Sequence, residues 1–246
     1  MKEKISTLQV EKVNFNYPNE TQFKGLKNVS FSLNEAETLV LVGKSGSGKT
    51  TLLKCIYGLN DLQSGSITFD NEQILGPAFH LIPGNINMKL VSTGYALLEH
   101  HTVYENIADV LIGFHDDYKA KKVNELLRLT EMTTLRDKKV NTLSDGQRQR
   151  VALAKAICIF PKLLLLDEPF SNLDIILKEK IFTYIKKKLK QNNSSCIIVT
   201  HRLDEVLSSA NYLGIIKNGR LIQLDTYKNI KKTPENEYTK SLIAYK

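Results

Sequence analysis

The chain has 246 residues, of which 42% are hydrophobic and 24% are charged. These proportions are ordinary for a soluble globular protein, and the length suffices for one large domain or two small ones. No apolar run approaches the roughly 18 residues that a membrane-spanning helix needs, and residues 1–10 contain no apolar core of a signal peptide. The formal net charge of +8 comes mostly from lysine, which permits contact with nucleic acid or an anionic membrane surface and demonstrates neither.

Short strands dominate the first part of the chain. Runs at 8–15, 29–33 and 66–69 are rich in strand-forming residues, and each is followed by turn-forming residues. This spacing predicts an antiparallel β layer. Tyr17 follows the first run, where an aromatic ring either stacks on a purine or packs at a turn.

Residues 39–59, LVLVGKSGSGKTTLLKCIYGL, combine a buried strand, a glycine-rich loop and a helix. Gly43, Gly48, Lys49 and Thr50 fit the P-loop pattern G-x-x-x-x-G-K-[ST]. The glycines let successive backbone N–H groups form an anion-binding nest, to which the following helix adds its N-terminal amides and dipole. Lys49 is expected to reach the β- and γ-phosphates, and the Thr50 hydroxyl to bind Mg²⁺. A glycine-rich turn without a ligand is the alternative.

The next segment contains an irregular stretch, a short strand and two helices. Residues 77–88 have no clear period, and 89–93 have the composition of a strand. Residues 103–114 and 118–132 have the apolar spacing of helices.

Residues 140–174, VNTLSDGQRQRVALAKAICIFPKLLLLDEPFSNLD, contain a helix followed by a buried strand. The helix is predicted over 147–159 with Ser144 or Asp145 as its N-cap, and the strand over 163–166.

Two carboxylates, Asp167 and Glu168, follow that strand at its carboxyl end. In open α/β sheets, ligands bind at this edge. We expect Asp167 to hold Mg²⁺ through water, and Glu168 to orient and deprotonate an attacking water; a solvated acidic turn is the alternative. Another buried strand, 195–200, ends at His201, which either hydrogen-bonds a γ-phosphate oxygen or is structural.

The rest of the chain adds one long helix, a hairpin and short surface helices. The helix is predicted over 175–189 and the surface helices over 226–246. Strands at 212–217 and 220–224 flank the Asn-Gly pair at 218–219, a strong hairpin signal.

Together these motifs resemble those of the nucleotide-binding subunits of ATP-binding cassette (ABC) transporters, over roughly residues 8–230. GKSGSGKT matches the Walker A motif, LLLLDEP the Walker B motif, LSDGQ at 143–147 resembles the LSGGQ signature, and SNLD at 171–174 resembles the D-loop. His201 matches the family's switch histidine, and Tyr17 its adenine-stacking aromatic residue. The ordered set is far more specific than a P-loop alone.

The resemblance implies an α/β fold, with a P-loop NTPase (RecA-like) core, an antiparallel β layer and an inserted α-helical subdomain. The whole chain, 1–246, would be a single ABC ATPase domain. Its core would occupy about 1–92 and 160–225, the helical subdomain about 93–159, and short C-terminal helices 226–246.

The resemblance also assigns site residues for ATP and Mg²⁺. Residues that would contact the nucleotide are Tyr17, Gly43, Lys44, Ser45, Gly46, Ser47, Gly48, Lys49, Thr50, Thr51, Ser144, Gly146, Gln147 and Asp174. Thr50 and Asp167 would bind the metal, and the catalytic residues would be Glu168, His201 and Lys49.

In this family two cassettes face head to tail, and each ATP lies between one P-loop and the other cassette's signature. Ser144, Gly146 and the helix N-terminus offer donors to the γ-phosphate. ATP would then favour the closed dimer, and hydrolysis would remove that preference. The resemblance therefore implies a homodimer or paired cassette, and a separate integral membrane permease that reads the closing motion through the helical subdomain.

The expected location is cytoplasmic, peripheral on the inner face of the cell membrane through that permease. Cys55, Cys158 and Cys196 are far apart in apolar surroundings and lack metal-ligand spacing, which favours buried thiols in a reducing cytosol.

Two other classes compete with a transport ATPase. A non-transport cassette could act on a soluble or nucleic-acid complex, but nucleic-acid members of the family usually carry coiled-coil inserts or a second cassette, and neither is visible here. Nucleic acid is therefore not the expected partner. A small-molecule P-loop kinase leaves LSDGQ and the D-loop unexplained. The transported substance and its direction are not encoded in these motifs.

The sequence departs from the family at two positions. Aligned on YALLEHHTV, the family's Q-loop glutamine falls at Thr93, whose shorter side chain would reach Mg²⁺ and the attacking water only through another water. Asp145 replaces a glycine of the signature, so its carboxylate either repels the γ-phosphate or caps the helix while pointing away. We hypothesise that ATP hydrolysis survives but is slow or more tightly gated.

Restoring the family residues tests this hypothesis. We expect Thr93→Gln or Asp145→Gly to hydrolyse ATP faster than the parent, because each removes one of the two departures. The measurement is the rate of phosphate release by the purified variants. If neither exceeds the parent, these departures do not limit turnover.

Overall fold

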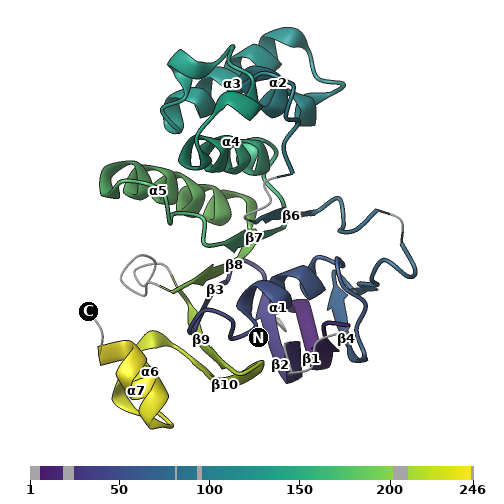
Figure 1. Ribbon diagram of the computed structural model, residues 1–246, viewed down its shortest axis with the longest axis vertical. Coiled ribbons are helices and arrows are strands. Elements are labelled where there is room, and N and C mark those ends of the chain that lie inside the picture. Colours follow the sequence, from purple (N-terminus) through teal and green to yellow (C-terminus); the bar gives the residue numbers. More distant parts are fainter. Residues whose placement is uncertain (1–5, 19–24, 81, 93–95, 202–209, 245–246) are drawn as a thin grey trace.

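The computed structural model describes residues 6–18, 25–80, 82–92, 96–201 and 210–244. Figure 1 shows α2, α3 and α4 beyond α5 at one end of the molecule, the strands in the middle, and α6 and α7 at the opposite end. In chain order the elements are β1 (Ser6–Asn16), β2 (Gly25–Asn34), β3 (Thr38–Val42), α1 (Lys49–Ile56), β4 (Ser64–Phe69), β5 (Glu72–Gln73), β6 (Met88–Val91), α2 (Val103–Ala108), η1 (Asp109–Leu111), α3 (Asp116–Leu129), η2 (Thr133–Leu135), η3 (Val140–Thr142), α4 (Asp145–Cys158), β7 (Leu163–Asp167), α5 (Ile175–Asn192), β8 (Ser195–Thr200), β9 (Tyr212–Lys217), β10 (Arg220–Asp225), α6 (Tyr227–Lys232) and α7 (Glu237–Ala244).

The larger sheet has six strands in the order β10-β9-β3-β8-β7-β6. β10 pairs antiparallel with β9, and the other neighbours pair parallel. Because parallel strands end at the same edge, the loops after β3, β7 and β8 lie together. These loops carry GKSGSGKT, the Asp167–Glu168 pair and His201, so the topology alone gathers the three motifs.

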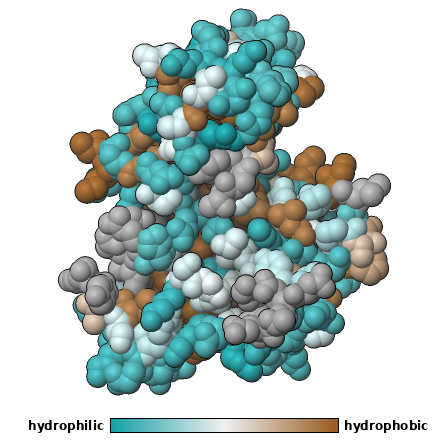
Figure 2. All heavy atoms as spheres, viewed as in Figure 1, coloured by the Kyte–Doolittle hydropathy of each residue, from teal (hydrophilic) through white to brown (hydrophobic). Residues whose placement is uncertain are grey.

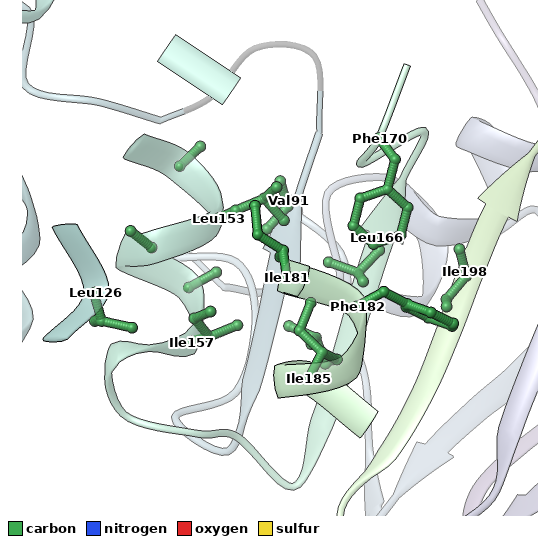
Figure 3. Close-up of a cluster of buried hydrophobic side chains, with 14 of the residues drawn as sticks. Val91, Leu126, Leu153, Ile157, Leu166, Phe170, Ile181, Phe182, Ile185 and Ile198 are labelled. Atoms are coloured by element: carbon green, nitrogen blue, oxygen red, sulfur yellow. The ribbon is translucent and has the colours of Figure 1, made fainter. Parts of the chain in front are cut away.

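Side chains alternate across this sheet and fill two separate cores. On one face, Val40 and Leu166 belong to a cluster that includes Leu153 of α4 and Ile181 of α5. Figure 3 shows Leu153, Leu166 and Ile181 directed toward one another from these three elements. On the other face, Leu41 packs into a cluster with α1 and the smaller sheet. Both faces are covered, which is why the central strands are continuous apolar runs.

The smaller sheet is antiparallel, with strand order β2-β1-β4-β5, as the sequence predicts. Val10 of β1 lies opposite Phe31 on one side and Ile67 on the other. The turn between β4 and β5 uses Asp70 and Asn71 at φ 50° and 65°, values that these two residue types tolerate better than most. Helix α1 packs between this sheet and the larger sheet, and this packing fixes the helix that follows the P-loop.

The helix predicted over 103–114 is too long. In the structure α2 ends at Ala108, the 3₁₀ turn η1 follows, and Ile112 leaves the helix with ψ 131°. Gly113 then adopts φ 91°, a conformation that glycine takes readily. The break at Gly113 redirects the chain into α3.

On the face seen in Figure 2, hydrophilic residues cover most of the surface and hydrophobic residues form small separate groups. Among the described residues, no helix is both long and apolar enough to cross a membrane.

Candidate functional site

The P-loop joins β3 to α1, and close packing explains its first glycine. A Cβ on Gly43 would lie 2.2 Å from the carbonyl oxygen of Ile216, so no larger residue fits. Gly46 and Gly48 adopt φ 76° and 107°, which favours glycine at both positions. Open space lies where a Cβ on Gly46 would project, as expected for a loop whose backbone must approach a ligand.

A pocket of about 180 Å³ lies over this loop. Its lining residues come from the end of β1, the start of β2, the P-loop, α1 and the loop after β7: Tyr17, Gly25, Ser45, Gly46, Gly48, Lys49, Thr50, Thr51 and Glu168. Eight of these nine are residues that the sequence singles out, and Gly25 is the one that it misses. The pocket therefore gathers predicted nucleotide, metal and catalytic residues in one place.

Gly25 escapes sequence reasoning because it belongs to no motif. A Cβ there would lie 1.9 Å from the carbonyl oxygen of Phe15, and the Gly25 carbonyl oxygen lies 3.0 Å from the Cβ position of Gly48. Glycine is required here by a tertiary contact between β1, β2 and the P-loop, which the sequence alone does not reveal.

The Lys49 side chain is folded back into the loop. Its Nζ donates hydrogen bonds to the carbonyl oxygens of Gly43 at 2.8 Å and Lys44 at 3.0 Å, and the residue is only 5% exposed. Burial lowers the pKa of Lys49, and the charges of Glu168 and Asp167 oppose this effect. The ammonium group is thus fixed by backbone dipoles beside the pocket.

Thr50 and Asp167 lie side by side across the strand edge. The Thr50 hydroxyl donates to Asp167 Oδ1 at 3.1 Å. Burial raises the pKa of Asp167, and the neighbouring Glu168 charge acts in the same direction, whereas the Thr50 hydrogen bond lowers it. A hydroxyl and a carboxylate are hard oxygen donors of the kind that Mg²⁺ prefers, so this pair fits the predicted metal site.

Glu168 and His201 form a contact that the sequence does not show. His201 Nδ1 lies 2.9 Å from Glu168 Oε2, joining the ends of β7 and β8. Glu168 has φ 47°, which is unusual for a residue other than glycine. Its carbonyl oxygen accepts from the side chains of Gln149 and Ser171 at 2.9 and 3.2 Å. These contacts hold the strained backbone and direct the carboxylate toward the pocket.

Tyr17 lies at the rim of the pocket. Its ring packs edge-on against Phe15, with centroids 4.9 Å apart, and its hydroxyl lies 3.3 Å from Thr51 Oγ1. The ring is therefore oriented before any ligand binds, which suits a stacking surface.

The signature and D-loop residues lie outside this pocket, at the N-termini of α4 and α5. Ser144 is the N-cap of α4 and exchanges hydrogen bonds with Gln147 in a capping box. Asp174 caps α5 by accepting from the Leu177 N–H at 2.9 Å. Among the described residues, none of these three lines the P-loop pocket. Asp145 is exposed at the first turn of α4, and Thr93 lies outside the described residues.

Signature and D-loop contact each other within the chain. A Cβ on Gly146 would lie 3.2 Å from the Asn172 carbonyl oxygen, so the α4 N-terminus packs closely on the D-loop. Gln149, three residues further along α4, reaches Glu168 and Ser171. The donors of the signature are therefore rigidly connected to the loop that follows β7.

The comparisons with known proteins agree with this geometry. A family model described as ABC transporter matches residues 26–171. The molybdate/tungstate import ATP-binding protein WtpC of Pyrococcus horikoshii is 36% identical over 240 residues, which cover 97% of this chain and 67% of that protein. The Fe(3+) ions import ATP-binding protein FbpC 2 of Haemophilus influenzae is 38% identical over 222 residues, covering 89% of this chain and 62% of that protein. The chain thus spans about two thirds of the length of these relatives.

Solved structures give the same fold. The dimeric structure of a post-hydrolysis state of the ATP-binding cassette MJ0796 bound to ADP and Pi matches with a TM-score of 0.76 at 26% identity, covering 89% of this chain and 98% of that chain. The structure of cbiO1 from Clostridium perfringens, part of the ABC transporter complex cbiONQ, matches with a TM-score of 0.72 at 28% identity, covering 94% and 92%.

The fold defines a P-loop NTPase with an added antiparallel β layer. The chain belongs to the ABC transporter family, and within it to the ATP-binding, ATP-hydrolysing class.

The raised pKa of Asp167 predicts a stability cost. Below the ordinary pKa of 3.8, the Asp167 carboxyl is protonated in both the folded and the unfolded chain, so its burial costs no ionisation energy. Above the raised folded-state pKa, the carboxyl is ionised in both states, and the folded protein bears the whole cost of the buried charge. Asp167→Asn keeps an acceptor for Thr50 and should raise the melting temperature of nucleotide-free protein at pH 7. The gain should shrink as the pH falls toward that ordinary value.

Calorimetry of the two proteins across this pH range checks the sign. Asp137→Asn, at a side chain that is 90% exposed, is the matched control and should leave the melting temperature unchanged. A lower melting temperature for Asp167→Asn at neutral pH would contradict the expectation.

Proposed function

We propose that this chain is the ATP-binding and ATP-hydrolysing subunit of an ABC transporter, which powers substrate movement across the cytoplasmic membrane through a separate permease. The observation that carries the proposal is the convergence of Lys49, the Thr50–Asp167 pair and the Glu168–His201 pair on one P-loop pocket.

The P-loop would bind the phosphates of ATP. Ser47 Oγ is buried and has no hydrogen-bond partner among the described residues, and the space over Gly46 is open; both observations fit a phosphate-binding cradle. The amides at the α1 N-terminus and the Lys49 ammonium supply donors and positive charge. The Tyr17 ring would stack on the base.

The Thr50 hydroxyl and the Asp167 carboxylate would hold Mg²⁺, directly or through water. When bound, this ion would supply positive charge that offsets the negative charge of the phosphates. The buried Asp167 carboxylate gains a counter-charge in the same event, which removes the cost that its burial imposes.

Glu168 would act as the general base in hydrolysis. Its carboxylate accepts the proton of the attacking water, and its contact with His201 Nδ1 fixes the carboxylate orientation. His201 would then be available to donate a hydrogen bond to the γ-phosphate. The backbone hydrogen bonds to Glu168 keep this group in position before ATP binds.

A second cassette would complete the site. Ser144, Gly146 and Gln147 lie away from the P-loop pocket of their own chain, so the N-terminus of α4 would serve the pocket of a partner. The dimeric form of the similar cassette MJ0796 supports such pairing. ATP would stabilise the closed pair by the difference in its affinity for the two states.

The helical part, about 93–159, would be the subdomain that contacts the permease. A pocket of about 290 Å³ lies where it meets the sheet, and its lining includes Tyr57, just after α1, and residues of β6, η1 and α4. Lys89 and Lys155 flank apolar residues there, which fits an amphipathic segment of a membrane protein. The chain would then sit in the cytoplasm, on the inner face of the membrane.

The substrate stays unassigned. Relatives named for molybdate or tungstate and for Fe(3+) ions have similar identities to this chain, so identity does not discriminate between these substrates. All the relatives compared are named as import proteins, which supports import as the direction.

Replacing Glu168 tests the catalytic assignment. Glu168→Gln keeps the side-chain size but removes the base, so turnover should fall by roughly 10²- to 10⁴-fold. ATP binding should persist and trap a dimer, which size-exclusion chromatography detects. Glu179→Gln, at an exposed position of α5, should behave like the parent. Retained turnover in Glu168→Gln would remove Glu168 from this role.

Replacing Lys49 tests ATP binding. Lys49→Ala loses charge-assisted hydrogen bonds worth about 1.5–3 kcal/mol each, so the Kd for ATP should rise by at least tenfold. Calorimetric titration measures this value, with Lys231→Ala, an exposed lysine of α6, as the control. An unchanged Kd for Lys49→Ala would contradict the assignment.

A further inference from the structure

The C-terminal helix α7 touches the P-loop directly. The backbone N–H of Lys44 donates a hydrogen bond of 2.9 Å to the hydroxyl oxygen of Tyr238. These residues are 194 positions apart in the chain, and no motif includes Tyr238. The contact joins the last described helix to the nucleotide pocket.

Lys44 is bonded through both of its backbone groups. While its N–H is held by Tyr238, its carbonyl oxygen accepts from Lys49 Nζ at 3.0 Å. A shift of this residue would therefore move an acceptor that fixes the Lys49 ammonium. Tyr238 is not among the residues that line the pocket, and its hydrogen bond to Lys44 is the link through which we expect it to act.

Tyr238 is itself held from several sides. Lys217 Nζ, at the end of β9, lies 4.8 Å from the centroid of the Tyr238 ring. The α6–α7 connection is fastened to β10 by Gln223, whose side chain donates to the Thr233 carbonyl oxygen at 2.9 Å and accepts from the Glu235 N–H at 3.2 Å. Contacts with β9 and β10 therefore fix the position of the Tyr238 hydroxyl.

The β9–β10 turn supports the same loop a few residues further on. Gly219 N–H donates to the Ser47 carbonyl oxygen at 2.8 Å, and the Gly219 carbonyl oxygen accepts from the Lys27 N–H at 2.8 Å. The outer side of the P-loop is therefore held at both Lys44 and Ser47 by the segment that ends in α7.

We propose that Tyr238 is a positioning residue that couples α7 to the nucleotide pocket: its hydroxyl fixes Lys44, and Lys44 fixes Lys49. The proposal rests on the function proposed above. Because coupling between two sites is reciprocal, nucleotide in the pocket also strengthens the docking of α7. A protein segment that displaces α7 would lower the affinity for ATP without entering the pocket.

The test compares Tyr238→Phe with the parent protein. The variant keeps the ring under Lys217 and loses only the hydroxyl, so the Kd for Mg-ATP should rise about 2- to 12-fold, the range for one hydrogen bond. Tyr227→Phe, at a partly buried tyrosine of α6, is the matched control and should leave the Kd unchanged.

A double-mutant cycle isolates the hydrogen bond from general packing. Lys44→Pro removes the N–H donor, so adding Tyr238→Phe to it should change the Kd by less than about 1.5-fold if the bond carries the coupling. Hydrogen exchange supplies the reciprocal readout: Mg-ADP should slow exchange over 237–244 in the parent and fail to do so in Tyr238→Phe.

Each outcome decides the proposal. An unchanged Kd in Tyr238→Phe overturns it, and so does an equal loss of affinity in the Lys44→Pro background, since either shows that Tyr238 does not act through Lys44. If the parent itself binds no ATP, the proposed function fails first and the coupling with it. That result is distinguishable because it shows in the parent and in both tyrosine variants.

Discussion

The burial of one ammonium group, that of Lys49, is the constraint on which the rest of the site depends. A lysine that is 5% exposed is stable only where backbone carbonyls or carboxylates surround it. The loop supplies two carbonyls, and the end of β7 supplies Asp167 and Glu168. In the strand order β8 lies between β3 and β7, and the parallel strands bring those carboxylates to the same edge of the sheet as the P-loop. The topology of the sheet therefore determines which charges surround the buried ammonium group.

The function proposed above divides the functional groups between two chains. Positive charge and amides gather at the P-loop, whereas the signature donors cap α4 and are tied to the D-loop through Gln149 and the close approach at Gly146. α4 packs on the larger sheet through residues such as Leu153, and the residues at its N-terminus do not line the P-loop pocket of their own chain. In the function proposed above, a pocket that needs both sets of donors therefore needs a partner cassette.

Much of this could be predicted from the sequence because the informative residues are neighbours along the chain. The P-loop, the carboxylate pair after β7 and the Asn-Gly hairpin turn each depend on local geometry, and each lies where its pattern places it. Gly25, the Glu168–His201 contact and Tyr238 could not be found in this way. Each depends on a contact with a residue on another strand, helix or loop, and this contact is visible only in the folded structure. The end of α2 at Ala108 is not predicted because the apolar period continues beyond it.

The left-handed backbone at Glu168 has an evolutionary consequence. Glycine or asparagine would occupy φ 47° at lower conformational cost, so a mutant library sorted only for thermal endurance should drift toward these residues at this position. Such variants would keep the architecture and lose the carboxylate that is proposed as the base. At this one residue, stability and the proposed chemistry therefore favour different side chains.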